Sequence, residues 1–178
     1  PKSVILQSKE KKKEVKNPPL LYNLADLQSF CSKAFHITPD NSLKIAQTLY
    51  EKKLTTYPRT DARVLSTAVA KDYERKFGYK IPSRYGNDRK ITDHYAIIPT
   101  FDNEGKRNYD GLNDLEKKVY EAIKGRFMDI MKPPFIYDAV SVTYNGVTYT
   151  SACKSESATT INVSLTGKCK ITIVTDTP

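Results

Sequence analysis

The sequence predicts an α+β fold in which a mainly helical block lies between two β-type ends. Within about residues 24–133, apolar residues recur at helical spacing, and helix start signals precede several of these stretches. Residues 134–178 show alternating patterns and contain Asn145-Gly146, a strong short hairpin signal. Residues 1–23 also have β-type character. The two ends are therefore interpreted as parts of one β structure into which the helical block is inserted.

The first two helices have clear start signals. Asn23 is a suitable N-cap for a helix whose apolar face continues to Phe35. Thr38 and Pro39 supply an N-cap and a proline at the first helical position, so a second helix is expected to begin there and to end near Lys53.

Two further helices are expected over residues 64–77 and 112–131. Residues 78–111 are rich in Gly, Pro, Asn, Asp and Arg, and they are interpreted as a long loop region with one extended apolar stretch, AIIPTF. The main candidate core residues of the four helices are Leu24, Leu27, Cys31, Leu43, Ala46, Leu49, Tyr50, Val64, Val69, Tyr73, Phe77, Leu115, Val119, Ile123 and Phe127.

The two ends are expected to form strands. Residues 4–8 could be a short strand, and the charged run of residues 9–16 suits either a solvated hairpin tip or an edge strand. Residues 136–152 are interpreted as a hairpin, and residues 161–174 are again strand-like.

Charge and composition narrow the class of protein. The net charge is +9, of which residues 1–23 carry +4 and residues 24–133 carry +5. A basic surface favours a polyanionic partner, although many basic proteins never bind nucleic acid. No apolar run approaches the roughly 20 residues that span a bilayer, and residues 1–13 lack the apolar core of a signal peptide. A cytoplasmic protein with no membrane partner is expected.

The cysteines do not indicate a metal site. The three cysteines, Cys31, Cys153 and Cys169, are widely spaced and form no C-x-x-C pair. This spacing does not match a zinc ribbon. They are interpreted as reduced thiols, and no metal ligands are assigned within the chain.

The loop Leu54–Asp61, with the sequence LTTYPRTD, contains residue types that suit attack on a phosphodiester. The phenolic oxygen of Tyr57 can be a nucleophile. In an extended stretch Arg59 lies on the same side of the chain, where its guanidinium could hold a phosphate, and Asp61 could orient it. The alternative is a surface turn with an ordinary tyrosine, one of twelve in the chain.

A second segment, Thr92–Thr100, holds one of only two histidines in the chain. His94 follows Asp93, and an exposed imidazole there can donate to a phosphate or carry a proton. The alternative is a histidine that only caps a loop.

Together these segments resemble a known family. LYEKKLTTYPRTD resembles the active-site tyrosine motif of type IA DNA topoisomerases, in particular the topoisomerase III branch, and DHYAIIPT resembles the family's second motif. PPLLYNLADLQ resembles the segment that leads into the tyrosine domain. The motifs occur in the family's order, and the resemblance covers about residues 17–135.

The resemblance implies roles for individual residues. Tyr57 matches the nucleophile that becomes linked to a DNA 5′-phosphate. Arg59 matches the arginine that positions and stabilises that phosphate, and His94 matches the histidine that contacts the DNA backbone near the cut. Supporting roles and further DNA contacts are expected from Thr60, Asp61, Arg63 and Lys53.

The resemblance also implies a larger context. The helical block would be the tyrosine domain, and the β-type ends would belong to an arch-like domain that carries it. The family's Mg²⁺ site lies in a Toprim domain with a D-x-D cluster, and no D-x-D occurs in this chain. The chain is therefore interpreted as a fragment that acts on single-stranded DNA, in a bacterial nucleoid or on a plasmid. It is expected to have no cofactor of its own. Without the Toprim and gate domains it is expected to have no relaxation activity. The alternative is a DNA-binding module with an idle tyrosine.

Overall fold

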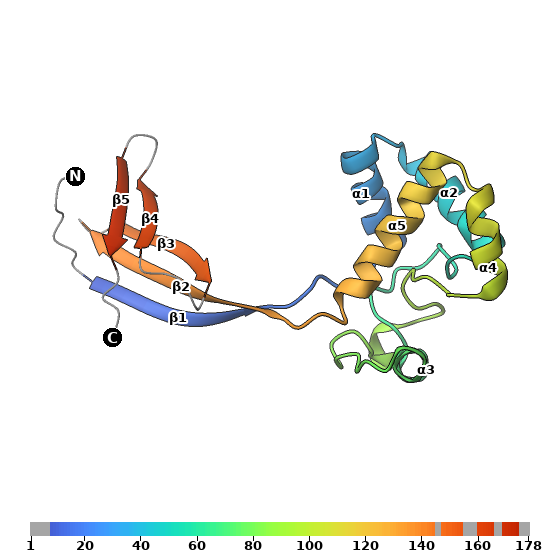
Figure 1. Ribbon diagram of the computed structural model, residues 1–178, viewed down its shortest axis with the longest axis horizontal. Coiled ribbons are helices and arrows are strands. Elements are labelled where there is room, and N and C mark those ends of the chain that lie inside the picture. The colour runs from blue at the N-terminus through green and yellow to red at the C-terminus, as the bar shows by residue number, and fades with distance from the viewer. Residues whose placement is uncertain (1–7, 145–146, 155–159, 166–168, 175–178) are drawn as a thin grey trace. The chain divides into compact units, whose positions relative to one another are not determined.

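The fold is α+β and consists of two compact units (Figure 1). Residues 18–133 form a helical unit, and residues 1–17 together with 134–178 form a β unit. The residues described by this computed structural model are 8–144, 147–154, 160–165 and 169–174. No helix among them is long and apolar enough to cross a membrane.

The described helical unit contains five α-helices and two short 3-10 turns. They are α1 (Leu24–Phe35), α2 (Pro39–Glu51), α3 (Thr67–Phe77), α4 (Asn103–Asn108) and α5 (Asp114–Asp129), with 3-10 turns at Asp88–Lys90 and Tyr109–Gly111. The predicted start of α1 is confirmed, because the Asn23 side chain accepts a hydrogen bond from the Asp26 amide at 2.8 Å. The start of α2 is confirmed as well, with Thr38 as N-cap and Pro39 in the first turn.

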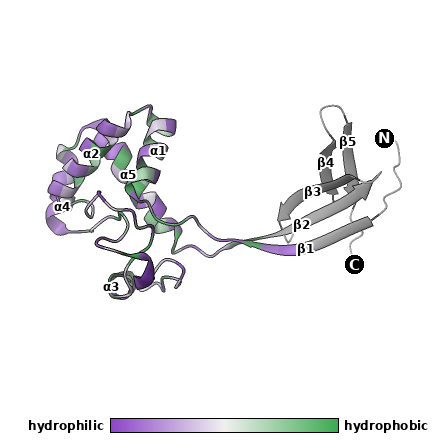
Figure 2. Ribbon diagram, turned by 180° about the vertical axis from the view of Figure 1, so that it is seen from behind, coloured by the Kyte–Doolittle hydropathy of each residue, from purple (hydrophilic) through white to green (hydrophobic). Residues whose placement is uncertain are grey.

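Helices α1, α2 and α5 lie side by side and enclose the main core (Figure 1). Their shared buried cluster includes Leu27, Cys31, Ala46, Leu49, Val119 and Ile123. A second cluster surrounds α3 and the end of α5, and it includes Leu65, Ala70, Tyr85, Ile98 and Phe127. Helix α3 is largely hydrophilic in Figure 2, and Ala70 is its only buried residue.

Two predictions for the helices are wrong in detail. Helix α3 begins at Thr67 rather than residue 64, because Val64 is extended and its carbonyl accepts the Ala96 amide at 3.0 Å. Leu115 is 37% exposed rather than buried, and Tyr120 lies in the core in its place.

The prediction that residues 78–111 form a long loop region with one extended stretch missed a helix. Helix α4 begins after Asp102, whose carboxylate accepts the amides of Glu104 and Gly105. Six residues are too few to show a helical repeat of apolar residues, so the capping aspartate was the only signal of α4 in the sequence.

The β unit consists of antiparallel strands. Its described strands are β1 (Ser8–Lys16), β2 (Phe135–Tyr144), β3 (Val147–Lys154), β4 (Thr160–Leu165) and β5 (Cys169–Val174). The order β1-β2-β3 makes the charged β1 an edge strand, which confirms one of the two interpretations of that run, and β4 pairs with β5. Tyr144 pairs with Val147, as the predicted hairpin requires. The turn residues Asn145 and Gly146 and most of the expected strand 4–8 lie outside the described residues.

Residues 18–23, which the sequence placed with the β end, belong to the helical unit. The Leu21 amide donates to the Arg63 carbonyl at 3.0 Å, and Tyr22 pairs with Ile97 in an isolated antiparallel β-bridge. These partners lie far along the chain, so they are not visible as a local pattern.

Candidate active site

The segment that contains Tyr57 is held against the segment that contains His94 by threonine hydroxyl groups. The Thr56 hydroxyl donates to the Ala96 carbonyl at 3.0 Å and accepts the Ile98 amide at 3.0 Å. The Thr60 hydroxyl donates to the His94 carbonyl at 3.0 Å. The two hydroxyls thus link the segments through residues before and after Tyr57 in the sequence.

Side chains along residues 58–63 alternate between the interior and the solvent. Pro58, Thr60 and Ala62 are buried, whereas Arg59, Asp61 and Arg63 are exposed. An extended chain directs successive side chains to opposite sides, so the threonine that holds the segment and the arginine that faces solvent are neighbours in sequence.

The structure brings Tyr57 and His94 together. Their ring centroids lie 4.5 Å apart, and the Tyr57 ring also meets Tyr50 edge to face, with centroids 5.4 Å apart. Tyr57 is half-buried and His94 is exposed. Within the described part of the chain, neither the Tyr57 hydroxyl nor the Arg59 guanidinium has a hydrogen-bond partner. Both groups are therefore available to a ligand.

A pocket of about 420 Å³ adjoins Tyr57. Its lining residues are Tyr50, Thr55, Thr56, Tyr57, His94, Tyr95 and Thr100. Burial raises the pKa of Tyr95, which keeps this phenol neutral at physiological pH. The hydroxyl of Thr55 is buried without a partner among the described residues.

The other predicted site residues have partners within the fold. Arg63 forms an ion pair with Asp26 at 2.9 Å. Asp61 is exposed, and its backbone carbonyl accepts the Asn23 side chain at 3.3 Å. Among the described contacts Asp61 has none with Arg59, so the structure does not show the expected orienting bond.

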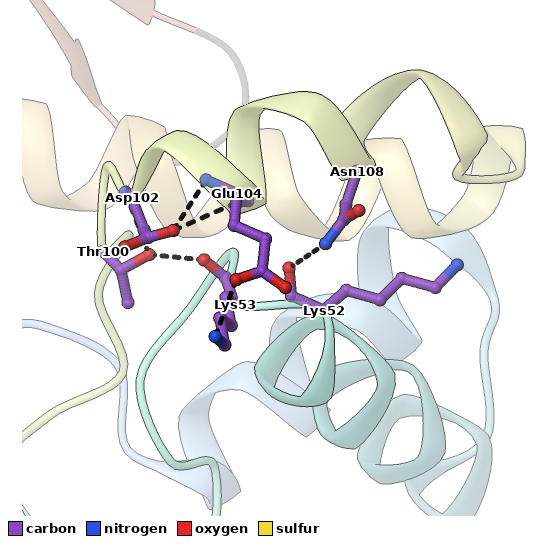
Figure 3. A network of polar contacts seen from close by, with 7 residues as sticks. Lys52, Lys53, Thr100, Asp102, Glu104 and Asn108 are labelled. Atoms are coloured by element: carbon purple, nitrogen blue, oxygen red, sulfur yellow. Dashed lines mark hydrogen bonds and ion pairs between the residues drawn. The ribbon is translucent and has the colours of Figure 1, made fainter.

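Lys53 lies in a polar network that joins α2 to α4 (Figure 3). Its ammonium group forms an ion pair with Glu104 at 2.7 Å, and the hydrogen bond raises the pKa of Lys53. Its carbonyl accepts the Thr100 hydroxyl at 2.7 Å, and its backbone has a positive φ of 59°. The side chain predicted to contact DNA is thus engaged by α4, directly behind the tyrosine segment.

Tyr50 and Tyr95 were not among the predicted site residues. The sequence placed Tyr50 in the apolar stripe of α2, but it is 41% exposed and faces the pocket. Its position seven residues before Tyr57, within the quoted tyrosine motif, was the only sequence signal available.

Comparisons with known proteins identify the family of the chain. The family model described as DNA topoisomerase matches residues 1–164. The chain belongs to the type IA DNA topoisomerase family.

Among the curated relatives, the chain is 36% identical over 158 residues to DNA topoisomerase 3 of Bacillus subtilis (strain 168), covering 77% of this chain and 21% of the relative. It is 33% identical over 163 residues to DNA topoisomerase 3 of Staphylococcus aureus (strain NCTC 8325 / PS 47), covering 81% and 22%. The chain thus spans about a fifth of the length of these relatives.

A solved structure has a similar fold. Full-length topoisomerase I from Thermotoga maritima matches with a TM-score of 0.63 at 24% identity, covering 85% of this chain and 28% of that one. At this identity the match concerns the fold alone.

Proposed function

We propose that this chain carries the strand-cleaving tyrosine of a topoisomerase. The Tyr57 oxygen attacks a phosphodiester of single-stranded DNA and forms an oxygen–phosphorus bond. The bond from phosphorus to the 3′-oxygen breaks, and that oxygen leaves as a 3′-hydroxyl with the proton that the phenol gives up. A 5′-phosphotyrosine link remains, another strand passes, and the reverse reaction reseals the DNA. The observation that carries this proposal is the unpaired Tyr57 hydroxyl beside His94 in an open pocket.

Arg59 would stabilise the charge that develops on the phosphate. Its side chain lies on the solvent side of the extended segment, free of other partners within the described residues. A guanidinium can grip two phosphate oxygens with parallel hydrogen bonds. His94, which touches the Tyr57 ring, would contact the DNA backbone near the cut.

The complete reaction cycle would require further domains. Among the described residues, no group of three or more His, Cys, Asp or Glu could hold a metal ion. The residues that the structure describes therefore do not fit the Mg²⁺ expected for the family, and no step above involves it. We assign the metal to a Toprim domain of the parent enzyme and the β unit to the arch-like domain of that enzyme. The parent enzyme would act on DNA in the bacterial cytoplasm.

The proposal is tested in a complete enzyme that contains this chain. Cleavage of a labelled single-stranded oligonucleotide is followed on a denaturing gel, where the covalent adduct migrates with the protein. Tyr57→Phe should abolish the adduct and leave DNA binding intact, because it removes the only atom that forms the link. Tyr79→Phe is the matched control, since Tyr79 is 61% exposed and lies outside the pocket. An adduct that persists in Tyr57→Phe would show that this tyrosine is idle and would support the DNA-binding alternative.

A further inference from the structure

The pocket beside Tyr57 differs chemically from the exposed surface around Arg59. Four of its seven lining residues are aromatic, counting His94, and the other three are threonines. No lysine, arginine, aspartate or glutamate contributes to the lining. A phosphate group needs cationic or amide partners, whereas a flat neutral ring with polar edges suits aromatic walls and hydroxyl groups.

Tyr50 is the exposed aromatic wall of this pocket. It lies in the last turn of α2 and is 41% exposed, although α2 buries its neighbour Leu49 completely. Its ring centroid lies 5.4 Å from that of Tyr57. A group in contact with Tyr50 is thus within one nucleotide of a phosphate that Tyr57 attacks.

The pocket also has the size and polarity that a base would require. Its volume of about 420 Å³ lies within the range of about 300–1,000 Å³ that is usual for small-ligand sites. Thr55, which is 1% exposed, lines it with a hydroxyl that has no partner among the described residues. Buried hydroxyl groups in proteins normally have a partner, so an occupant with polar edges would suit this wall.

We propose that this pocket holds a nucleobase of the cleaved strand, adjacent to the scissile phosphate, with Tyr50 as its stacking partner. The inference rests on the proposed function, because Tyr57 defines where the phosphate lies. Stacking on an aromatic ring accepts every base, since each has a π face. The pocket would therefore set the position of the strand relative to Tyr57 without selecting a sequence.

The experiment measures binding in a complete enzyme that carries Tyr57→Phe, so that no cleavage occurs. Short single-stranded oligonucleotides are compared with versions in which the nucleotide on either side of the mapped cut is abasic. We expect one of the abasic positions to weaken binding by about 5- to 100-fold, the range for loss of one stacked base. Tyr50→Ala should weaken binding of the intact strand by a similar factor and should have little further effect on the abasic strand. Tyr50→Phe should retain most of the affinity, and Tyr79→Ala is the control for an exposed tyrosine elsewhere.

Several results would overturn the inference. The enzyme with an intact Tyr50 could bind the intact and abasic strands equally well. That result would overturn the inference even if the Tyr50 variants failed to fold. The affinity of Tyr50→Ala for the abasic strand could instead fall by the product of the two separate losses. That result would show that Tyr50 and the base at this position act independently. Unchanged binding in Tyr50→Ala, with slower cleavage when Tyr57 is present, would show that Tyr50 only positions Tyr57. None of these results bears on the adduct test with Tyr57→Phe, so the proposed function stands or fails by itself.

Discussion

The outward and inward sides of the tyrosine segment differ in what supports them. On the outward side, Arg59 is exposed and has no partner among the described residues. On the inward side, Thr60 is buried and bonds both the His94 carbonyl and the Ala62 amide. The difference teaches that accessible side chains and side chains that support the fold alternate along one extended segment. Substitutions on the two sides should therefore affect different measurements.

The largest effect is expected on the outward side. Arg59→Lys keeps the positive charge but loses the planar fork that grips two phosphate oxygens. In a complete enzyme it should slow cleavage of bound DNA by about 10²–10³-fold, the order found when one preorganised donor is removed. Single-turnover cleavage measures the rate, and thermal unfolding should stay unchanged. If Arg59→Lys instead strongly weakened binding and left the rate for bound DNA at saturation intact, Arg59 would be a docking residue.

A large loss of stability is expected behind the segment, where α4 meets Lys53. A Cβ atom at Gly105 would overlap the backbone carbonyl of Lys53, so Gly105→Ala must displace α4. The expected cost is about 2–3 kcal/mol, the upper part of the range of about 1–3 kcal/mol for overpacked sites. Gly125→Ala on α5 is the matched control, because its added Cβ meets nothing within 4 Å. Chemical denaturation should show the first variant destabilised and the second unchanged or slightly more stable.

Thr60→Val tests the inward side directly. It removes a hydroxyl that makes two hydrogen bonds of 3.0 and 3.1 Å, and it leaves buried backbone groups without a partner. The free energy of unfolding should fall by about 2 kcal/mol. Thr60→Ser keeps the hydroxyl and should restore most of the loss. A stable Thr60→Val variant beside a destabilised Thr60→Ser variant would mean that the methyl group, and not the hydrogen bonds, supports the segment.

Tyr73→Phe is expected to have a smaller effect. The Tyr73 hydroxyl donates to the Pro99 carbonyl at 2.7 Å, and burial raises the pKa of this phenol, so it stays a donor throughout the physiological range. Loss of this one hydrogen bond should cost about 1 kcal/mol in denaturation experiments. Tyr79→Phe, at an exposed position, should show no change.

The smallest effect concerns the exposed pair of Lys53 and Glu104. The pKa of Lys53 is raised in the folded state, so the pair stabilises the fold below the ordinary lysine pKa of about 10.4 and loses that contribution as pH rises through the folded value. The small difference in thermal midpoint between the unmodified chain and Glu104→Gln should therefore disappear at strongly alkaline pH. Asp26→Asn, which breaks the pair with Arg63, should show no such alkaline dependence, because arginine stays charged. A difference for Glu104→Gln that stayed constant to high pH would contradict the assignment.

The contact between helix α4 and Lys53 was harder to predict from the sequence than the starts of helices α1 and α2. The start signals at Asn23 and Thr38 act within one helical turn, and both helices begin where these signals predict. The short helix α4 and the positive φ of Lys53 depend on packing between segments about 50 residues apart, where Gly105 approaches the Lys53 carbonyl. No pattern within a short window encodes such an approach.

The sequence by itself determined the four longer helices, the strand character of the two ends and the two segments that carry Tyr57 and His94, because periodicity, capping and motif spacing are local properties of the chain. Only the tertiary structure decided which side chains meet. It placed Tyr50 and Tyr95 beside Tyr57, and it engaged Lys53 with Glu104. The physical reason is that these contacts join residues distant in sequence, and their geometry follows from how the threonine hydroxyls and the buried helix faces pack together.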